Sequence, residues 1–90
     1  MAEKRERLDV IHDILRTIIK NNNKIGPTRL IQLSNLSPRM FKEYIKDLTE
    51  QELILVKQEK NKKTYEVGNK GYAYLEKYKQ FKNFVEELGI

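Results

Sequence analysis

The sequence predicts a small α+β domain with the element order helix, short strand, helix, turn, helix, β-hairpin and long helix. Three observations predict it. Apolar residues recur every three or four positions in three stretches, which is typical of amphipathic helices. Residues 53–67 alternate in steps of two, which is typical of strands. Turn-forming residues separate these stretches, and 90 residues suit one domain, 1–90, rather than two.

The first predicted helix runs from about Glu3 to Lys20. Its apolar residues share one face by their spacing: Leu8, Ile11, Ile14, Leu15, Ile18 and Ile19. Residues 21–23 are all asparagine, which favours a turn because its side chain competes for backbone hydrogen bonds. We expect a short strand at residues 24–25.

The next two helices are predicted from their start signals. Residues 26–28, Gly-Pro-Thr, begin a brief helix that carries Leu30, Ile31 and Leu33. After a turn at residues 35–36, a helix over 38–50 follows. Ser37 can cap it by accepting a hydrogen bond from a free backbone N–H, and Pro38 suits its first position because proline lacks that N–H. Together these helices form a helix-turn-helix, a motif that also occurs in helical proteins that bind nothing.

The helix over 38–50 has one apolar face and one basic face. The apolar face holds Phe41, Tyr44, Ile45 and Leu48, and the opposite face holds Arg39, Lys42, Glu43 and Lys46. A basic helix face suits the phosphate-lined groove of DNA, and the general alternative is a solvated surface. For Glu43, pairing within its own helix, with Arg39 or Lys46, is the alternative to a DNA contact.

Residues 53–67 predict a hairpin, with strands at 53–59 and 64–67. Two-residue alternation places four side chains on its inward side: Ile54, Val56, Tyr65 and Val67. The polar turn between the strands is Lys60, Asn61, Lys62 and Lys63. A basic hairpin after a helix-turn-helix is a wing, here over 57–65, and the fold is a winged helix-turn-helix. The alternative is a lysine-rich turn that keeps a sheet edge soluble.

The last predicted helix spans 69–88, and its apolar stripe is wider than one small core needs. We expect the core and wing, residues 3–68, to use its first two turns, and a second copy of the chain to cover the rest. The residues predicted for this homodimer interface are Tyr74, Tyr78, Phe81, Phe84, Val85 and Leu88. The alternative is that the monomer core uses the whole stripe. Two exposed Phe rings on a monomer would favour aggregation.

The charge of the chain favours a polyanionic partner, since its net charge is +5 and its pI about 9.5. Residues 20–46 hold six cations and one carboxylate, and residues 57–70 hold five cations and two carboxylates. From Gly71 onward, three lysines balance three glutamates. The predicted DNA-contacting set comprises the basic helix face, the turn at 60–63 and five further polar residues around the helix-turn-helix: Thr28, Arg29, Ser34, Asn35 and Ser37.

The composition argues against several classes of function. The chain has no cysteine, which excludes disulfides and thiolate sites and suits a reducing cytosol. The sole histidine, His12, has no second histidine with which to bind a metal. No glycine spacing fits a phosphate-binding loop, and no carboxylate pair suits acid–base catalysis. We therefore expect no enzyme, cofactor, metal site or evident small-molecule ligand.

The longest apolar run is four residues, 53–56, too short to span a bilayer. We accordingly expect no membrane association and a cytoplasmic protein, associated with the nucleoid in a prokaryote.

Two segments, NLSPRMFKEYIKDLTEQELI and YEVGNKGYAYLEKY, together resemble the archaeal winged-helix transcriptional regulators. That family includes small chromatin-associated DNA-binding proteins that dimerise through a C-terminal coiled coil. The resemblance covers roughly Leu8 to Tyr78. It implies that the helix over 38–50 enters the major groove, that the wing touches the DNA backbone or minor groove, and that the last helix joins two protomers. By position, the groove-facing residues would be Arg39, Lys42, Glu43 and Lys46, and the wing tip Lys60, Asn61, Lys62 and Lys63.

The chain departs from this family in two places. The family often has a glycine where this chain has Glu52, so we expect a differently shaped turn there. It often reads Leu-Thr where this chain has Val67-Gly68, which leaves Gly68 or Asn69 to cap the last helix. Neither departure touches the groove-facing residues. Three functions stay open: a transcriptional regulator, an architectural DNA-binding protein with little sequence preference, and a winged helix that binds other proteins.

Overall fold

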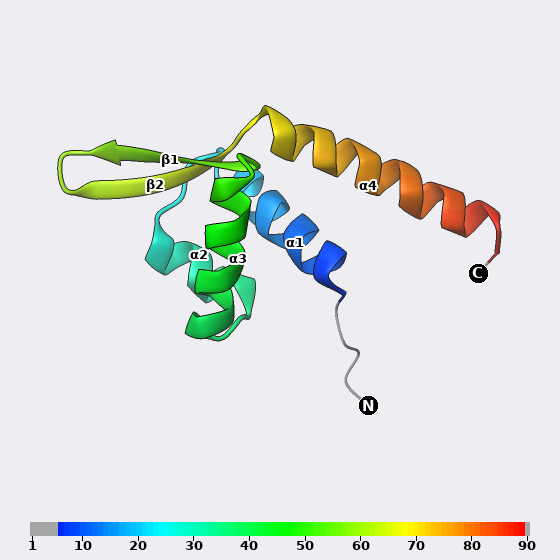
Figure 1. Cartoon of the computed structure of the whole chain (residues 1–90), viewed down its shortest axis with the longest axis horizontal. Helices are drawn as coiled ribbons and strands as arrows, with labels where there is room; N and C mark the ends of the chain where they lie inside the picture. Colours follow the sequence, from blue (N-terminus) through cyan, green and yellow to red (C-terminus); the bar gives the residue numbers. More distant parts are fainter. Residues whose placement is uncertain (1–5, 90) are drawn as a thin grey trace.

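The computed structural model describes residues 6–89, which form four helices and one two-stranded antiparallel sheet (Figure 1). The elements are α1 (Arg7–Lys20), α2 (Pro27–Ser34), α3 (Pro38–Glu50), β1 (Ile54–Glu59), β2 (Lys62–Val67) and α4 (Asn69–Glu87). The predicted α+β class is confirmed, and the elements follow the predicted order except that residues 24–25 do not form a strand. The first helix begins at Arg7, and the predicted helical residues 3–5 lie outside the described part of the chain.

A single hydrophobic core lies where α1, α2, α3 and the sheet meet. Its buried residues are Val10, Ile11, Ile14, Leu15, Ile18, Ile25, Leu30, Phe41, Ile45, Leu48, Ile54, Tyr65 and Val67. Most residues predicted for the apolar helix faces are among them. Leu8 and Leu33 are exceptions, since both are exposed. Leu8 lies near the start of α1 and Leu33 near the end of α2.

The start of α3 matches the prediction. The Ser37 hydroxyl accepts a hydrogen bond from Met40 N at 3.2 Å, and Pro38 is the first helical residue. The preceding turn has the left-handed residue Asn35, with φ of +59°. Asparagine tolerates this conformation better than most residues, so the turn between α2 and α3 needs no glycine.

The end of α3 carries a strained residue, Glu52, whose φ is +65°. Leu53 N donates to Leu48 O at 2.9 Å, and Glu52 N donates to Thr49 O at 3.1 Å. These two hydrogen bonds form a Schellman motif, in which glycine normally holds the left-handed position because a Cβ is strained there. The turn thus has the backbone conformation that glycine favours, although a glutamate occupies the position.

Replacing Glu52 with glycine is therefore expected to stabilise the fold by about 0.5–1 kcal/mol. The ion pair that Glu52 makes with Lys70 is exposed on both sides, so its loss should matter little. Urea unfolding of the two proteins measures the difference. The neighbouring Gln51→Gly is the control, because Gln51 has an ordinary φ of −86° and glycine there should destabilise. A stabilisation by both variants, or by neither, would contradict the assignment of strain to Glu52.

The hairpin pairs Ile54 with Val67 and Val56 with Tyr65 across the two strands. Its turn is two residues long, Lys60 and Asn61, rather than the four predicted, because β2 begins at Lys62. The predicted strand at residues 24–25 is reduced to one bridge, in which Ile25 and Tyr65 exchange hydrogen bonds of 3.2 and 2.8 Å.

Val56 differs from the other three residues predicted for the inward side of the hairpin, because it is not buried. It shares this face with Tyr65, but it is 46% exposed. The bridge with Ile25 covers β2, so β1 is the free edge, and the wing extends beyond the helices (Figure 1).

The first turn of α4 lies close against the hairpin because of Gly71. A Cβ at this position would collide with Leu53 O and Val67 Cγ1, so only glycine allows this approach. Of the two candidate N-cap residues, Gly68 and Asn69, the helix α4 uses Gly68. No side-chain hydrogen bond caps this end of the helix.

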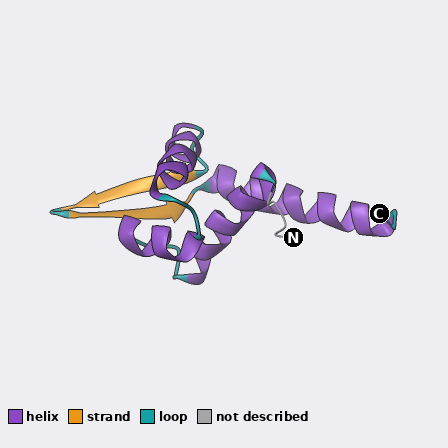
Figure 2. Ribbon diagram, turned by 90° about the horizontal axis from the view of Figure 1, so that it is seen from below, coloured by secondary structure: helices purple, strands orange, loops and turns teal. Residues whose placement is uncertain are grey.

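Two tyrosines join α4 to α1. The Tyr74 hydroxyl donates to Leu8 O at 2.7 Å, and the Tyr78 hydroxyl donates to Asp9 Oδ1 at 2.5 Å. The His12 ring stacks on the Tyr78 ring, with 4.1 Å between centroids. The C-terminal part of α4 continues past the N-terminal end of α1 (Figures 1 and 2). Only the first half of α4 therefore belongs to the body of the domain.

The Tyr78–Asp9 hydrogen bond makes the free energy of unfolding depend on pH in both the alkaline and the acidic range. Burial and the bond to Asp9 raise the pKa of Tyr78 from 10.0 to about 12. The same bond lowers the pKa of Asp9 below its ordinary 3.8. The contribution of Tyr78 to the free energy of unfolding is fully present below pH 10 and is lost as the pH rises through about 12. The aspartate contribution is present above pH 3.8 and is lost as pH falls.

We expect Tyr78→Phe to lower the free energy of unfolding by about 1 kcal/mol at neutral pH and to flatten its decline between pH 10 and 12. Denaturant unfolding at a series of pH values measures both effects. Tyr72→Phe is the matched control, because the Tyr72 ring is on the same helix and is exposed. An unchanged alkaline decline in Tyr78→Phe would show that another group causes it.

Candidate nucleic-acid interface

The outward face of α3 is basic because its apolar face is fixed in the core. Phe41, Ile45 and Leu48 are buried, which turns Arg39, Lys42 and Lys46 to solvent. The Arg39 side chain is 90% exposed, and its Nε lies 3.8 Å from Glu43 Oε2. Glu43 thus adopts the pairing within its own helix that the sequence offered as the alternative.

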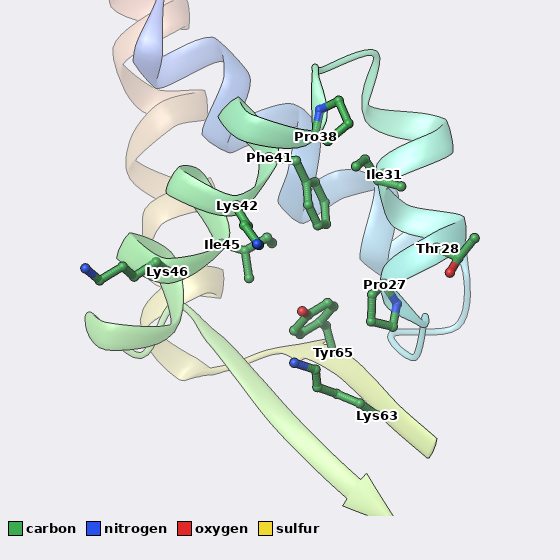
Figure 3. A pocket seen from close by; sticks show the side chains of 10 residues that line it. All are labelled: Pro27, Thr28, Ile31, Pro38, Phe41, Lys42, Ile45, Lys46, Lys63 and Tyr65. Carbon is green, nitrogen blue, oxygen red and sulfur yellow. The ribbon is translucent and has the colours of Figure 1, made fainter. Parts of the chain in front are cut away.

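Lysines from α3 and β2 meet at one groove, which has a volume of about 460 Å³ (Figure 3). Its lining residues are Pro27, Thr28, Ile31, Pro38, Phe41, Lys42, Ile45, Lys46, Lys63 and Tyr65. Figure 3 shows Lys42 and Lys63 extending over the groove from opposite sides, whereas Lys46 points outward. The Lys63 ammonium lies 5.9 Å from the centre of the Tyr65 ring. Among residues 6–89, none of these three lysines forms an ion pair.

The remaining basic residues lie around this surface. Arg29 is exposed on the first turn of α2, and Thr28 beside it lines the groove. Lys60, Asn61 and Lys62 lie together at the wing tip, where they line a separate hollow with Glu59. The structure therefore divides the predicted wing residues, with Lys63 beside α3 and the other three at the end of the hairpin.

Ser34 does not belong to this surface, which corrects its place in the predicted DNA-contacting set. It is 7% exposed. Its hydroxyl donates to Ile31 O at 3.0 Å and accepts from Leu36 N at 3.4 Å, so it supports the turn from inside. Asn35 is exposed but borders a different hollow, which it shares with His12 and Arg16 of α1. The turn contributes only Ser37 to the outward face.

Sequence reasoning missed the apolar floor of the groove. It assigned Phe41, Ile45 and Tyr65 to the core, where they are indeed buried, but one edge of each also lines the groove. A periodic pattern tells which side of an element is apolar. It carries no signal for a gap between three elements.

The predicted dimer interface separates into two parts. Tyr74 and Tyr78 are half-buried against α1. The second part, which we name the C-terminal stripe, consists of Phe81, Phe84, Val85 and Leu88 on the projecting end of α4. The three largest of these side chains are 55–57% exposed. The exposed Leu8 of α1 borders a small hollow with Phe81 and extends the apolar surface.

Within residues 6–89, no three His, Asp or Glu side chains gather in a way that would hold a metal ion. His12 lies 3.2 Å from Asp13 Oδ1 and stacks on Tyr78, as expected for a packing residue. None of the helices in this part of the chain has the length and apolarity needed to cross a bilayer.

Comparison with known proteins places these features in a family. A sequence model described as winged helix-turn-helix matches residues 4–86. The structure is similar to that of Sso10a-2, a DNA-binding protein from Sulfolobus solfataricus, with a TM-score of 0.76 and 26% identity over 93% of this chain and 85% of that one. It is also similar to F93 from STIV, a winged-helix DNA-binding protein, with a TM-score of 0.71 and 18% identity over 87% and 90% of the two chains. No match was found among curated protein sequences.

Proposed function

Because the chain belongs to the winged helix-turn-helix family, we propose that it binds double-stranded DNA through α3, the start of α2 and the wing. One observation carries the proposal. Lys42 and Lys46 of α3 and Lys63 of β2 line one groove, and Glu43, which lies among the cations of α3, is paired with Arg39. Sso10a-2, which shares 26% of its residues with this chain, is named as a DNA-binding protein.

The exposed side chains suggest a division of roles. Lys42 and Lys46 neutralise phosphates, and displacement of counterions from the DNA favours binding. The planar fork of Arg39 can donate two hydrogen bonds to guanine once it leaves Glu43. The first turn of α2 offers Thr28 and Arg29 to the DNA backbone.

The wing adds contacts further along the duplex. Lys60 and Lys62 are exposed at the end of the hairpin, within reach of a neighbouring backbone or minor groove. Lys63 lies next to α3 and would contact the same stretch of DNA as Lys42.

The protein is proposed to act as a homodimer held by the C-terminal stripe. A two-fold dimer would present two α3 helices to successive major grooves, about 34 Å apart, and would read a palindromic site. If each protomer engages three or four phosphates, the log–log dependence of affinity on salt should have a slope of roughly −6. We expect such a protein in the cytoplasm or the nucleoid, where it would serve as a transcriptional regulator rather than an enzyme.

An architectural role is the second candidate, and the kind of cation on the face favours it. Five of the seven exposed cations assigned to DNA are lysines: Lys42, Lys46, Lys60, Lys62 and Lys63. Lysine binds phosphate as a point charge and reads bases less well than arginine does. Such a face would coat DNA with little sequence preference.

Fluorescence anisotropy with labelled duplexes over a series of salt concentrations tests the proposal. DNA binding with a steep negative salt slope is expected, and a slope near zero would contradict it. Selection from a random duplex library separates the two candidates, because a regulator enriches a palindrome and an architectural protein does not. If no duplex binds, a winged helix used for protein contacts becomes the better explanation, with Met40, Leu55 and Val56 as its exposed apolar residues.

A further inference from the structure

The groove between α2, α3 and β2 has a floor that DNA contacts do not explain. Six of its ten lining residues are apolar or aromatic: Pro27, Ile31, Pro38, Phe41, Ile45 and Tyr65. The backbone and base edges of DNA offer mainly polar groups, which gain little from such a floor. The volume of about 460 Å³ lies in the range of small-molecule sites.

The lysines at the rim of the groove favour a negatively charged ligand. Lys42 and Lys63 extend over it from opposite sides (Figure 3), and its lining contains no acidic residue. A ligand with one carboxylate and an apolar body would place its charge between these two ammonium groups. Its body would then cover the apolar lining of the groove, chiefly Pro27, Ile31 and Pro38, which gains hydrophobic free energy without leaving a charge unpaired.

We propose that this groove binds a small amphiphilic anion, specifically an aromatic carboxylate, and that the bound anion weakens DNA binding. An aromatic body suits the floor because a flat ring can lie against the half-buried Pro27 and Ile31 and contact the edges of Phe41 and Tyr65. The second half of the inference rests on the proposed function, since Lys42 and Lys63 are also assigned to DNA. An anion between them offsets one of their two positive charges and obstructs the approach of a phosphate.

Calorimetric titration with 2-naphthoate tests the site itself. A Kd of roughly 0.1–1 mM is expected for a ligand of this size in an open groove. Ile31→Phe should abolish binding by filling the groove while leaving every lysine in place. Leu33→Phe is the matched control, since Leu33 is on the same helix but does not line the groove. Lys63→Gln should weaken binding about tenfold, and the neutral 2-naphthalenemethanol should bind similarly less tightly than naphthoate.

Several results would overturn the proposed site. They are the absence of saturable naphthoate binding, equal binding to Ile31→Phe and the wild-type protein, and equal affinity for naphthoate and the neutral alcohol. Equal binding to Ile31→Phe would place the ligand elsewhere, for instance on the C-terminal stripe. Circular dichroism of the Ile31→Phe protein verifies that it is folded.

Anisotropy with a labelled duplex tests the effect on DNA, with sodium acetate replacing sodium naphthoate at equal ionic strength. Naphthoate at saturation should weaken duplex binding at least about fivefold in the wild-type and Leu33→Phe proteins, and should leave Ile31→Phe unaffected. Naphthoate binding without any change in DNA affinity would overturn the proposal that the bound anion weakens DNA binding. If the protein binds no duplex even without naphthoate, the proposed function fails, whereas the calorimetric result still decides whether the groove is a site.

Discussion

Replacing Arg39 and Lys42 with alanine is expected to weaken duplex binding at least about thirtyfold at moderate salt. Both side chains point outward from α3, and together they supply the proposed base-reading fork and a phosphate contact. The free energy of unfolding should change by less than about 0.5 kcal/mol, because the only ion pair lost among residues 6–89 is the exposed Arg39–Glu43 pair. Anisotropy measures the first effect, and thermal unfolding the second.

The control for this double variant must remove the same net charge elsewhere. Lys77 and Lys79 are exposed on α4, outside the surface assigned to DNA, and replacing both with alanine also lowers the net charge by two. This control should bind duplex almost as the wild-type protein does. If both variants lost affinity equally, binding would depend on overall charge rather than on α3. Unaltered binding by the Arg39/Lys42 variant would favour a protein-binding role.

Replacing Phe81 and Phe84 with aspartate is expected to convert a dimer into a monomer. The two rings are 57% and 55% exposed on the projecting end of α4, so burying them between protomers is the main hydrophobic gain available there. Four carboxylates facing one another would oppose that association strongly. Light scattering gives the mass, and duplex affinity should fall about a hundredfold because one protomer can no longer hold the other near its half-site.

A matched control for the added charge is the pair Lys79→Gln and Asn83→Asp, which changes the net charge of each protomer by the same two units. These positions are exposed on the same part of α4 and lie on the side of the helix opposite the stripe. This control should remain dimeric. A monomeric wild-type protein, or a control that dissociates as fully as the stripe variant, would exclude the proposed interface.

The helices of the fold could be predicted because each carries its own local signal. Ser37 and Pro38 mark the start of α3, and the three- and four-residue spacing of Phe41, Ile45 and Leu48 identifies the buried face. Val56 shows the limit of such patterns. Alternation assigns Val56 to the same side of the hairpin as Tyr65, but it does not tell how far the covering elements extend.

The site was only partly predictable for related reasons. The basic face of α3 follows from the sequence of one helix, whereas Lys63 lines the same groove as that face only because β2 forms another side of it. Ser34 was predicted to contact DNA from its place in the turn, yet its hydroxyl satisfies backbone groups of that turn. Tyr78 and Phe81 belong to one apolar stripe in the sequence, and the limited length of α1 decides which of them is covered.

In the proposed dimer, the length of α4 beyond α1 would set the distance between the two α3 helices. Each residue inserted between the tyrosines at 74 and 78 and the C-terminal stripe would lengthen the helix by about 1.5 Å and rotate the stripe by about 100°. Changes in α4 length can therefore alter the spacing and the rotational phase of the half-sites while α3 stays the same. Chains of this design can diverge in operator geometry without any change in the side chains that touch bases.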